Sequence, residues 1–284
     1  MKLFFALLFS SFCLFSQAQL LNLSTEWFTE GGFFNEEIIQ QYNIGSIGIY
    51  KSTKLDGAYF SSEKEALKYL FNSKGQLKQS FKFTSFTNKI DSSSFHFFYT
   101  KKNNIYKRIE NEGPFSFTYY FIYQDKNLVK EIKIDNNSPC LDTAYIRLYN
   151  HEWIDDQIFK TTYYNSIQRP YQYKEEKFDL FGQLVYQKIQ LARSLNFSEK
   201  KLSYTINQLT EKQKFTSIGK QQSHTWKYSY KKGVLDLIQH YNNDILIEKI
   251  GFTYQKDGLL SAIVTRDLKR KSVIIYKFNY TFLD

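Results

Sequence analysis

The chain has 284 residues, with 38 Lys and Arg against 28 Asp and Glu, so its formal net charge is +10. This balance suits an anionic envelope surface, a polyanionic glycan or nucleic acid. We interpret most lysines, such as Lys133 and Lys200, as solvated strand and turn residues, and expect no nucleic-acid partner. Cys13 lies in an N-terminal apolar run, and Cys140 alone cannot form an intramolecular disulfide. A disulfide-stapled secreted miniprotein is therefore excluded, and packing must stabilise the fold.

The N-terminus has the pattern of a secretory signal peptide. Lys2 precedes an apolar run over residues 3–15, and Ser16 and Ala18 provide the small residues of a cleavage site. We predict a signal peptide over residues 1–18 and a mature protein that starts at Gln19. Because the run is shorter than the roughly 20 residues of a membrane-spanning helix, no transmembrane helix is expected in the mature chain. The protein is expected to be exported, to the periplasm, the cell surface or the medium.

Residues 19–70 are predicted to form an N-terminal cap with short helices and a strand. Asn35 is placed to cap a helix over residues 36–42. Ser62 and Glu65 have the spacing of a capping box before a second helix at residues 66–70.

The rest of the chain, residues 71–284, is predicted to be a domain of repeated β-hairpins. The chain holds 23 Tyr and 27 Phe but only three Pro, a composition that favours strands. Apolar and polar residues alternate over residues 77–84, 115–123 and 276–282, as expected for strands with one buried face. The predicted fold class is all-β: an antiparallel up-and-down meander of hairpins, forming an extended twisted sheet or an open barrel.

Similar hairpin tips recur along this domain. Each has an aromatic residue, polar residues, a glycine or asparagine and then a leucine, which suits a turn that needs a positive φ. The predicted tips lie at Gly75, Asn127, Gly182, Gly233 and Gly258. Polar turns at residues 101–104 and 155–156 fall between them. Turns of the opposite end are expected at residues 87–89, 111–114, 136–139 and 166–170, which together hold all three prolines.

One of these tips resembles a known repeat. The segment FDLFGQL at residues 178–184 is similar to the YD-type repeat of Rhs-like bacterial proteins, and less closely to MORN-variant hairpins. Only this tip keeps the aspartate of the repeat, and no tip has its arginine. The resemblance implies a hairpin-repeat sheet in an exported protein of the Bacteroidota type, and it implies no activity.

Catalytic patterns are sparse, so the protein is not expected to be an enzyme or to hold a cofactor. The four histidines are far apart in sequence, with no zinc motif. One tip brings several potential ligand-binding side chains close together in sequence: His151, Trp153, Asp155 and Asp156 lie within six residues. They are the candidate binding residues, because carboxylates with histidine could hold a hard cation and an exposed Trp could stack on a sugar or anchor a partner. The alternative is a polar turn with Trp153 folded back onto the sheet.

Three classes of function remain. The favoured class is a non-catalytic envelope protein whose aromatic sheet is structural or binds a glycan, a lipid or a protein. The second is an outer-membrane β-barrel, which needs apolar outward bands of about 9–11 residues per strand. The segment 129–135 carries Lys130, Glu131 and Lys133 on both faces and offers no such band. The third is a secreted hydrolase whose site is assembled from distant residues.

Overall fold

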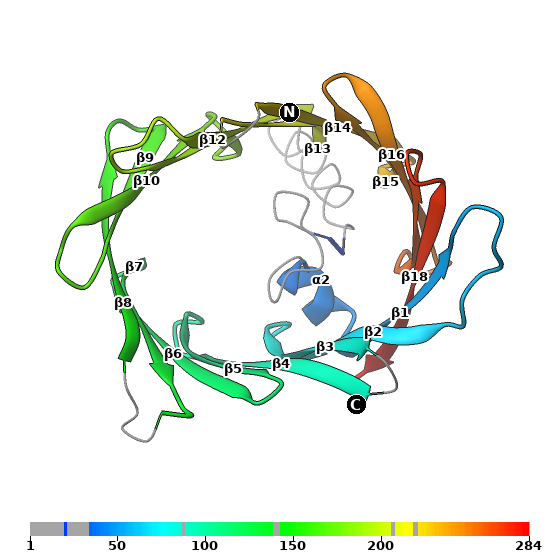
Figure 1. The fold of residues 1–284 in the computed structure, drawn as a ribbon, viewed down its shortest axis with the longest axis horizontal. Helices are drawn as coiled ribbons and strands as arrows, with labels where there is room; N and C mark the ends of the chain where they lie inside the picture. The colour runs from blue at the N-terminus through cyan, green and yellow to red at the C-terminus, as the bar shows by residue number, and fades with distance from the viewer. Residues whose placement is uncertain are drawn as a thin grey trace, which may run out of the picture.

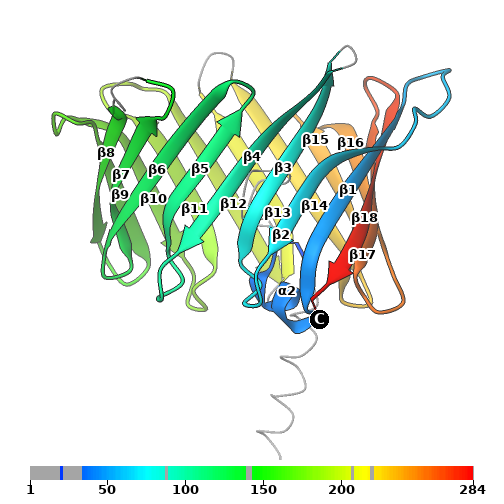
Figure 2. The same cartoon turned by 90° about the horizontal axis from the view of Figure 1, so that it is seen from below.

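The computed structural model describes residues 20–21, 34–86, 89–138, 143–205, 208–217 and 221–283. In this part of the chain, one short helix and 18 strands form a closed antiparallel barrel (Figures 1 and 2). Every strand pairs with its sequence neighbours, and β1 pairs with β18 to close the ring. The elements are α2 (Glu36–Gln41), β1 (Ile44–Lys54), β2 (Lys64–Phe71), β3 (Leu77–Phe86), β4 (Lys89–Tyr99), β5 (Ile105–Glu112), β6 (Phe115–Gln124), β7 (Asn127–Asp135), β8 (Thr143–Trp153), β9 (Ile158–Tyr164), β10 (Pro170–Phe178), β11 (Leu184–Leu191), β12 (Phe197–Thr205), β13 (Gln208–Thr216), β14 (Gln222–Lys231), β15 (Val234–Asn242), β16 (Ile245–Tyr254), β17 (Leu260–Asp267) and β18 (Ser272–Phe282).

The prediction of an all-β meander is confirmed, and the sheet closes. The predicted signal peptide, its cleavage site and Cys140 lie outside the described residues. The predicted boundary at residue 70 falls inside β2, which pairs with β1 and β3. No helix of the described residues is long and apolar enough to cross a membrane.

The barrel wall has a lumenal face and an outer face. Helix α2 lies inside the ring (Figure 1), and its Ile39 belongs to the same buried cluster as Ile47, Tyr69 and Phe278. Those three wall residues therefore face the lumen. Because partners directly opposite in an antiparallel sheet share a face and successive residues alternate, this assignment extends around the ring through the strand register.

The helix and its flanks fill one part of the lumen. The Asn35 side chain accepts a hydrogen bond from the Glu37 amide at 3.0 Å, which confirms the predicted cap. The Phe34 ring meets Tyr69 and Phe71 edge-on, with centroids 5.0 and 5.6 Å away. These contacts hold the N-terminal segment against β2.

The second predicted helix is wrong. Residues 66–70 belong to strand β2, where Leu67 and Tyr69 are buried on the lumenal face and Lys68 lies on the outer face. The pairing of β2 with both β1 and β3 satisfies its backbone groups on both sides. A local capping signal cannot outweigh two ladders of hydrogen bonds and a buried aromatic row.

The repeated tips form one end of the barrel, the end that carries α2 in Figure 2. Gly75, Gly182, Gly233 and Gly258 all have positive φ, from +76° to +89°, as predicted. Asn127 is different: it is the first residue of β7, and the positive φ of that turn is at Asp125. The turn between β6 and β7 consists only of residues 125 and 126, so Asn127 is already part of the strand.

Tyrosines near the tip end of the strands also link neighbouring hairpins. Each hydroxyl donates to the backbone carbonyl of the leucine that follows the preceding turn on the same end of the barrel. The bonds run from Tyr99 to Leu77, Tyr204 to Leu184, Tyr230 to Leu209, Tyr254 to Leu235 and Tyr280 to Leu260, at 2.6–3.1 Å. Each of these five tyrosines therefore binds the hairpin that precedes it along the chain.

Candidate functional site

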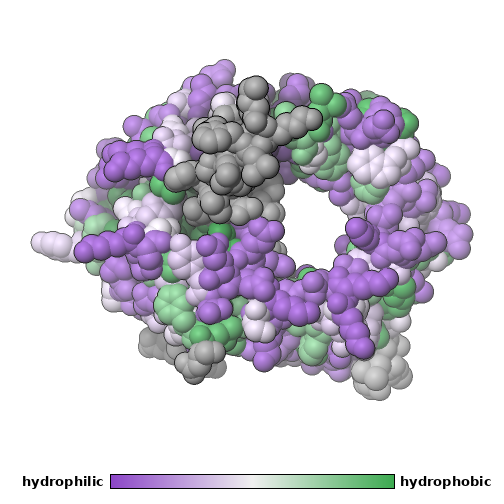
Figure 3. All heavy atoms as spheres, turned by 180° about the vertical axis from the view of Figure 1, so that it is seen from behind, coloured by the Kyte–Doolittle hydropathy of each residue, from purple (hydrophilic) through white to green (hydrophobic). Residues whose placement is uncertain are grey.

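The lumenal face differs around the ring. On β1–β4 and β15–β18, the apolar side, it carries most of the buried cluster, including Ile49, Phe95 and Ile263. On β5–β10, the charged side, aromatic rings alternate with Arg, Lys and Glu. Figure 3 shows an opening through the molecule, displaced toward the side of the ring where Figure 1 places β6–β10. The charged side therefore borders open lumen.

Glu131 is the centre of the charged side. It is 9% exposed and lies opposite Arg147, whose guanidinium is 3.8 Å away. The hydroxyl groups of Tyr145 and Tyr149 each donate to one of its carboxylate oxygens. Residues 145, 147 and 149 share one face of β8, so period-two spacing places all three on one carboxylate. Burial and these hydrogen bonds raise the pKa of Tyr149, which keeps its hydroxyl a donor.

Cations also lie on the aromatic rings of β6. The Lys133 ammonium is 3.6 Å from the Phe117 ring centroid, and the Arg108 guanidinium is 4.2 Å from that of Tyr119. Both are cation–π contacts. The Arg108 Nε atom is buried and has no hydrogen-bond partner in the described structure. The rest of the guanidinium is accessible in part: the Arg108 side chain is 25% exposed, and its terminal nitrogen lies 3.7 Å from a Glu110 oxygen.

The next strands continue the pattern. Glu176 binds the Lys174 ammonium at 2.8 Å and accepts from the Gln187 amide at 2.7 Å. Burial, with a smaller effect of the Glu176 charge, raises the pKa of Tyr163 to about 12. The charged side thus presents hydroxyl, guanidinium, amide and carboxylate groups beside aromatic faces.

The predicted binding residues separate in the structure. His151 is lumenal: its Nε2 is 2.6 Å from the Leu128 carbonyl oxygen and its Nδ1 is 3.1 Å from the Thr161 hydroxyl. It makes the contact that tyrosines make in other hairpins. Asp155 accepts from the backbone amides of Gln157 and Ile158 at 2.8 Å, so it closes the turn. Among the described residues, no group of three His, Cys, Asp or Glu could hold a metal ion.

Trp153 and Asp156 are exposed at this tip. Trp153 is 59% exposed, and its ring packs on Phe159 and Phe178 with centroids 4.9 and 5.9 Å away. It therefore adds an accessible aromatic surface to the charged side at the tip end of the barrel. Whether this surface binds a ligand stays a prediction.

A second polar cluster lies on β14–β16. His224 Nδ1 is 3.0 Å from His240 Nε2, and His240 Nδ1 is 3.4 Å from a Glu248 oxygen. Trp226 stacks on His240, with centroids 4.4 Å apart. Burial, then the neighbouring His240 and Lys214, lowers the pKa of His224.

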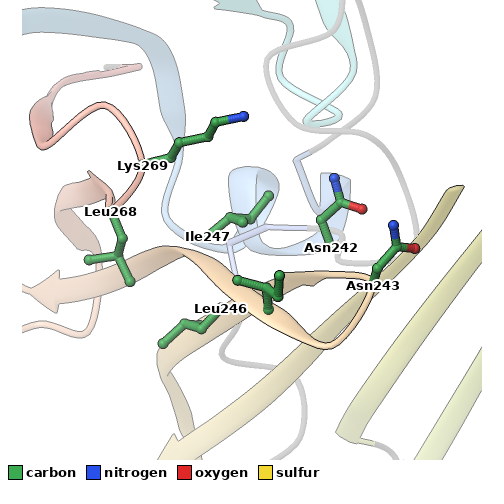
Figure 4. A pocket seen from close by; sticks show the side chains of 7 residues that line it. Asn242, Asn243, Leu246, Ile247, Leu268 and Lys269 are labelled. Carbon is green, nitrogen blue, oxygen red and sulfur yellow. The ribbon is translucent and has the colours of Figure 1, made fainter.

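A pocket of about 470 Å³ lies at the rim opposite the tip end. It is formed by the β15–β16 turn and the β17–β18 turn, and Figure 4 shows the carboxamides of Asn242 and Asn243 side by side at one edge. Leu246, Ile247 and Lys269 line the rest. The Asn242 Oδ1 atom is buried without a hydrogen-bond partner in the described structure.

Sequence reasoning did not identify the charged side chains that face the lumen. Lys133 and Lys200 were interpreted as solvated, but they lie on the lumenal face, which they share with the buried residues Tyr119 and Leu202. The signal was period two: Glu131 and Lys133 alternate with Lys130 and Ile132. It could not be used without knowing which face points inward.

No protein-family model matches the sequence, and no curated protein matches it. Among solved structures, a porin-like protein from Bacteroides uniformis is similar with a TM-score of 0.42 and 10% identity, over 83% of this chain and 98% of that one. A porin-like protein from Bacteroides vulgatus has a TM-score of 0.30 at 10% identity, over 84% and 99%. The TcdB2-TccC3-Cdc42 structure has a TM-score of 0.30 at 9% identity, over 76% of this chain and 17% of that one. Similarity at this level assigns no function.

Proposed function

We propose that this protein is an exported β-barrel of the bacterial envelope. Its outer wall faces water, and it binds an oligosaccharide along the charged side of its lumen. The observation that carries this proposal is the charged side itself, where aromatic rings, guanidinium groups and carboxylates border an open lumen. The binding is non-covalent, and a bound oligosaccharide is expected to be recovered uncut.

The chemistry of the charged side suits a sugar chain. Aromatic rings offer apolar surface to sugar rings, while charged groups give strong hydrogen bonds to hydroxyls. Arg108 provides a partly exposed guanidinium beside the Tyr119 ring, and Trp153 provides an exposed ring at one end of the lumen. Tyr145, Tyr149 and Arg147 are already held by Glu131, so the wall is preorganised for a ligand.

Charged side chains on the outer wall support the proposal that this wall faces water. Register places five charges of alternating sign opposite one another on neighbouring strands β8 to β12. Three pairs of outer-face charges are within 3.3–3.9 Å: Glu152 with Lys160, Lys177 with Glu175, and Lys188 with Glu199. A lysine facing lipid at mid-bilayer costs about 2–4 kcal/mol. Such a row is stable in water and costly in a bilayer.

A pore is the second candidate, because closure into an 18-stranded barrel and the visible opening are both features of a channel. The closed ring matches the geometry of the outer-membrane barrel. The two proposals differ in what surrounds the wall. Purification of the mature chain without detergent, followed by size-exclusion chromatography, separates them. Aggregation without detergent, together with ion conductance in liposomes, would favour the pore.

The binding proposal is tested by calorimetry against a panel of oligosaccharides. Arg108→Lys keeps the charge but removes the planar fork, and Trp153→Ala removes the exposed ring. Each is expected to weaken binding about tenfold, in the range of a lost charge-assisted contact. Lys107→Gln changes the neighbouring outer-face residue and is expected to leave binding unchanged. Equal losses in all three variants, or no binding by the folded wild type, would contradict the proposal.

A further inference from the structure

Exposed apolar side chains recur along the end of the barrel that lies away from α2 in Figure 2. We call the stretch of this end from β9 through β18 to β2 the far rim. Its fully described turns lie at residues 55–63, 165–169, 192–196, 243–244 and 268–271. Each turn, or the residue directly after it, has an apolar side chain that is 43–97% exposed: Leu55 and Tyr59, Ile167, Leu195, Ile245 and Leu268. Such repetition along one edge indicates an interaction surface.

Basic side chains share the far rim with these apolar side chains. Its five turns hold more basic residues than carboxylates: Arg169, Arg193, Lys269, Arg270 and Lys271 against Asp56, Glu63 and Asp244. Two of these carboxylates are paired, because an Asp56 oxygen lies 3.3 Å from the Lys271 ammonium and Glu63 contacts Lys277. Arg169, Arg193 and Lys269 are exposed. The far rim is therefore both apolar and basic.

The tip end combines its exposed apolar side chains with the opposite charge. Among the described tip-end turns, the most exposed apolar side chains are Leu180 and Phe181, at 90% and 85%. Their turn at residues 179–183 and the adjacent turn at residues 154–157 contain three aspartates and no Lys or Arg. An anionic surface would therefore attract the far rim and repel this part of the tip end.

The pocket between the β15–β16 and β17–β18 turns adds a polar site to the far rim. Figure 4 shows Leu268 and Lys269 on one side of this pocket and Asn242 and Asn243 on the other. Ile245 and Leu268 are exposed apolar side chains of the rim and also line the pocket. An ammonium and carboxamides suit the phosphate and hydroxyls of a lipid headgroup, and the apolar side chains suit the start of its acyl chains.

We propose that the far rim docks the barrel, end-on, onto an anionic lipid surface. The apolar side chains enter the boundary between headgroups and acyl chains, the basic side chains meet the lipid phosphates, and the charged outer wall of β8–β12 stays in water. A second copy of the chain fits less well, because a two-fold contact would place the same basic side chains against one another. This proposal concerns the end of the barrel, so it does not depend on oligosaccharide binding in the lumen.

Co-sedimentation of the exported protein with lipid vesicles tests this proposal. Vesicles of equimolar phosphatidylcholine and phosphatidylglycerol should bind about tenfold more tightly than vesicles of phosphatidylcholine alone, and added salt should reduce this preference. Leu195→Ser with Ile245→Ser removes two apolar side chains of the far rim and should weaken binding to the anionic vesicles about tenfold. Arg169→Gln with Lys269→Gln should remove most of the preference for anionic vesicles.

The matched controls lie in exposed turns of the tip end. Leu180→Ser with Phe181→Ser removes apolar side chains of similar exposure, and Lys101→Gln with Lys126→Gln removes the same charge. Both control variants should bind the anionic vesicles as the wild type does.

Three outcomes would overturn the proposal. The folded wild type could fail to bind the anionic vesicles. The control variants could lose as much binding as the far-rim variants, which would show general attraction in place of a docking rim. Sedimentation without vesicles could show a wild-type dimer and a monomeric Leu195→Ser, Ile245→Ser variant, which would assign the far rim to a second copy of the chain.

Discussion

The apolar side and the charged side of this barrel are built from the same hairpin repeat, but their lumenal faces do different things. On the apolar side, wall residues such as Ile47 and Phe278 belong to the same buried cluster as residues of α2 and are essentially inaccessible. On the charged side, Tyr145 and Tyr149 are held by Glu131 instead of by a packed segment. A ring of this size cannot fill its interior with wall side chains alone. The comparison shows two solutions in one ring. The apolar side is stabilised by a packed core, whereas the charged side is stabilised by polar networks that leave its lumenal face accessible.

The largest expected effect is a cavity on the apolar side. Phe278→Ala removes a ring that is 3% exposed and should lower the free energy of unfolding by about 3–5 kcal/mol. Its neighbour Lys277 lies on the outer face and is exposed, so Lys277→Ala should cost less than about 1 kcal/mol. Urea denaturation of both variants measures the difference. Equal small losses would mean that the apolar side is not a packed core.

A second pair compares one turn on each side. A Cβ on Gly75 would lie 2.1 Å from the Glu36 carbonyl oxygen of α2, whereas a Cβ on Gly182 would meet nothing within 4 Å. Both glycines have positive φ, so alanine costs about 1 kcal/mol at each through backbone strain. Gly75→Ala should cost clearly more in thermal unfolding, because α2 must also move. Gly182→Val should cost about 1 kcal/mol or more, and a harmless result would contradict the turn.

On the charged side, Glu131→Gln should lower the free energy of unfolding by about 1–3 kcal/mol, because a carboxamide offers one acceptor oxygen to two tyrosine hydroxyls and no charge to Arg147. Glu175→Gln on the outer wall is the matched control. It breaks an ion pair between half-exposed side chains and should cost less than about 1 kcal/mol. If both variants unfold alike, the Glu131 network does not stabilise the charged side.

The smallest effect concerns His224. Its pKa is lowered in the folded state, so at mildly acidic pH the unfolded chain binds the proton more readily. The contribution of the neutral imidazole to stability is therefore present above pH 6.5, the ordinary value, and is lost as the pH falls through the lower folded pKa. Melting temperatures of the wild type should decline from pH 7 to pH 5 more than those of His224→Gln. Parallel curves would remove His224 as the cause.

The sequence alone determined the class of fold, because period-two alternation and the repeated turns at Gly75, Gly182, Gly233 and Gly258 are local consequences of backbone geometry. It also located the helix after Asn35, whose cap is a contact within three residues. The candidate tip was located, but not the separate environments of His151 and Trp153, which depend on neighbouring strands.

Only the tertiary structure decided which face points inward, because alternation is symmetric until the ring closes and α2 occupies one side of it. The same closure turned residues 66–70 into a strand, since β1 and β3 offered pairing on both sides. It also placed Glu131, Lys133 and Lys200 on the lumenal face of the wall instead of the outer face. These contacts join residues far apart in sequence, so no local pattern could reveal them.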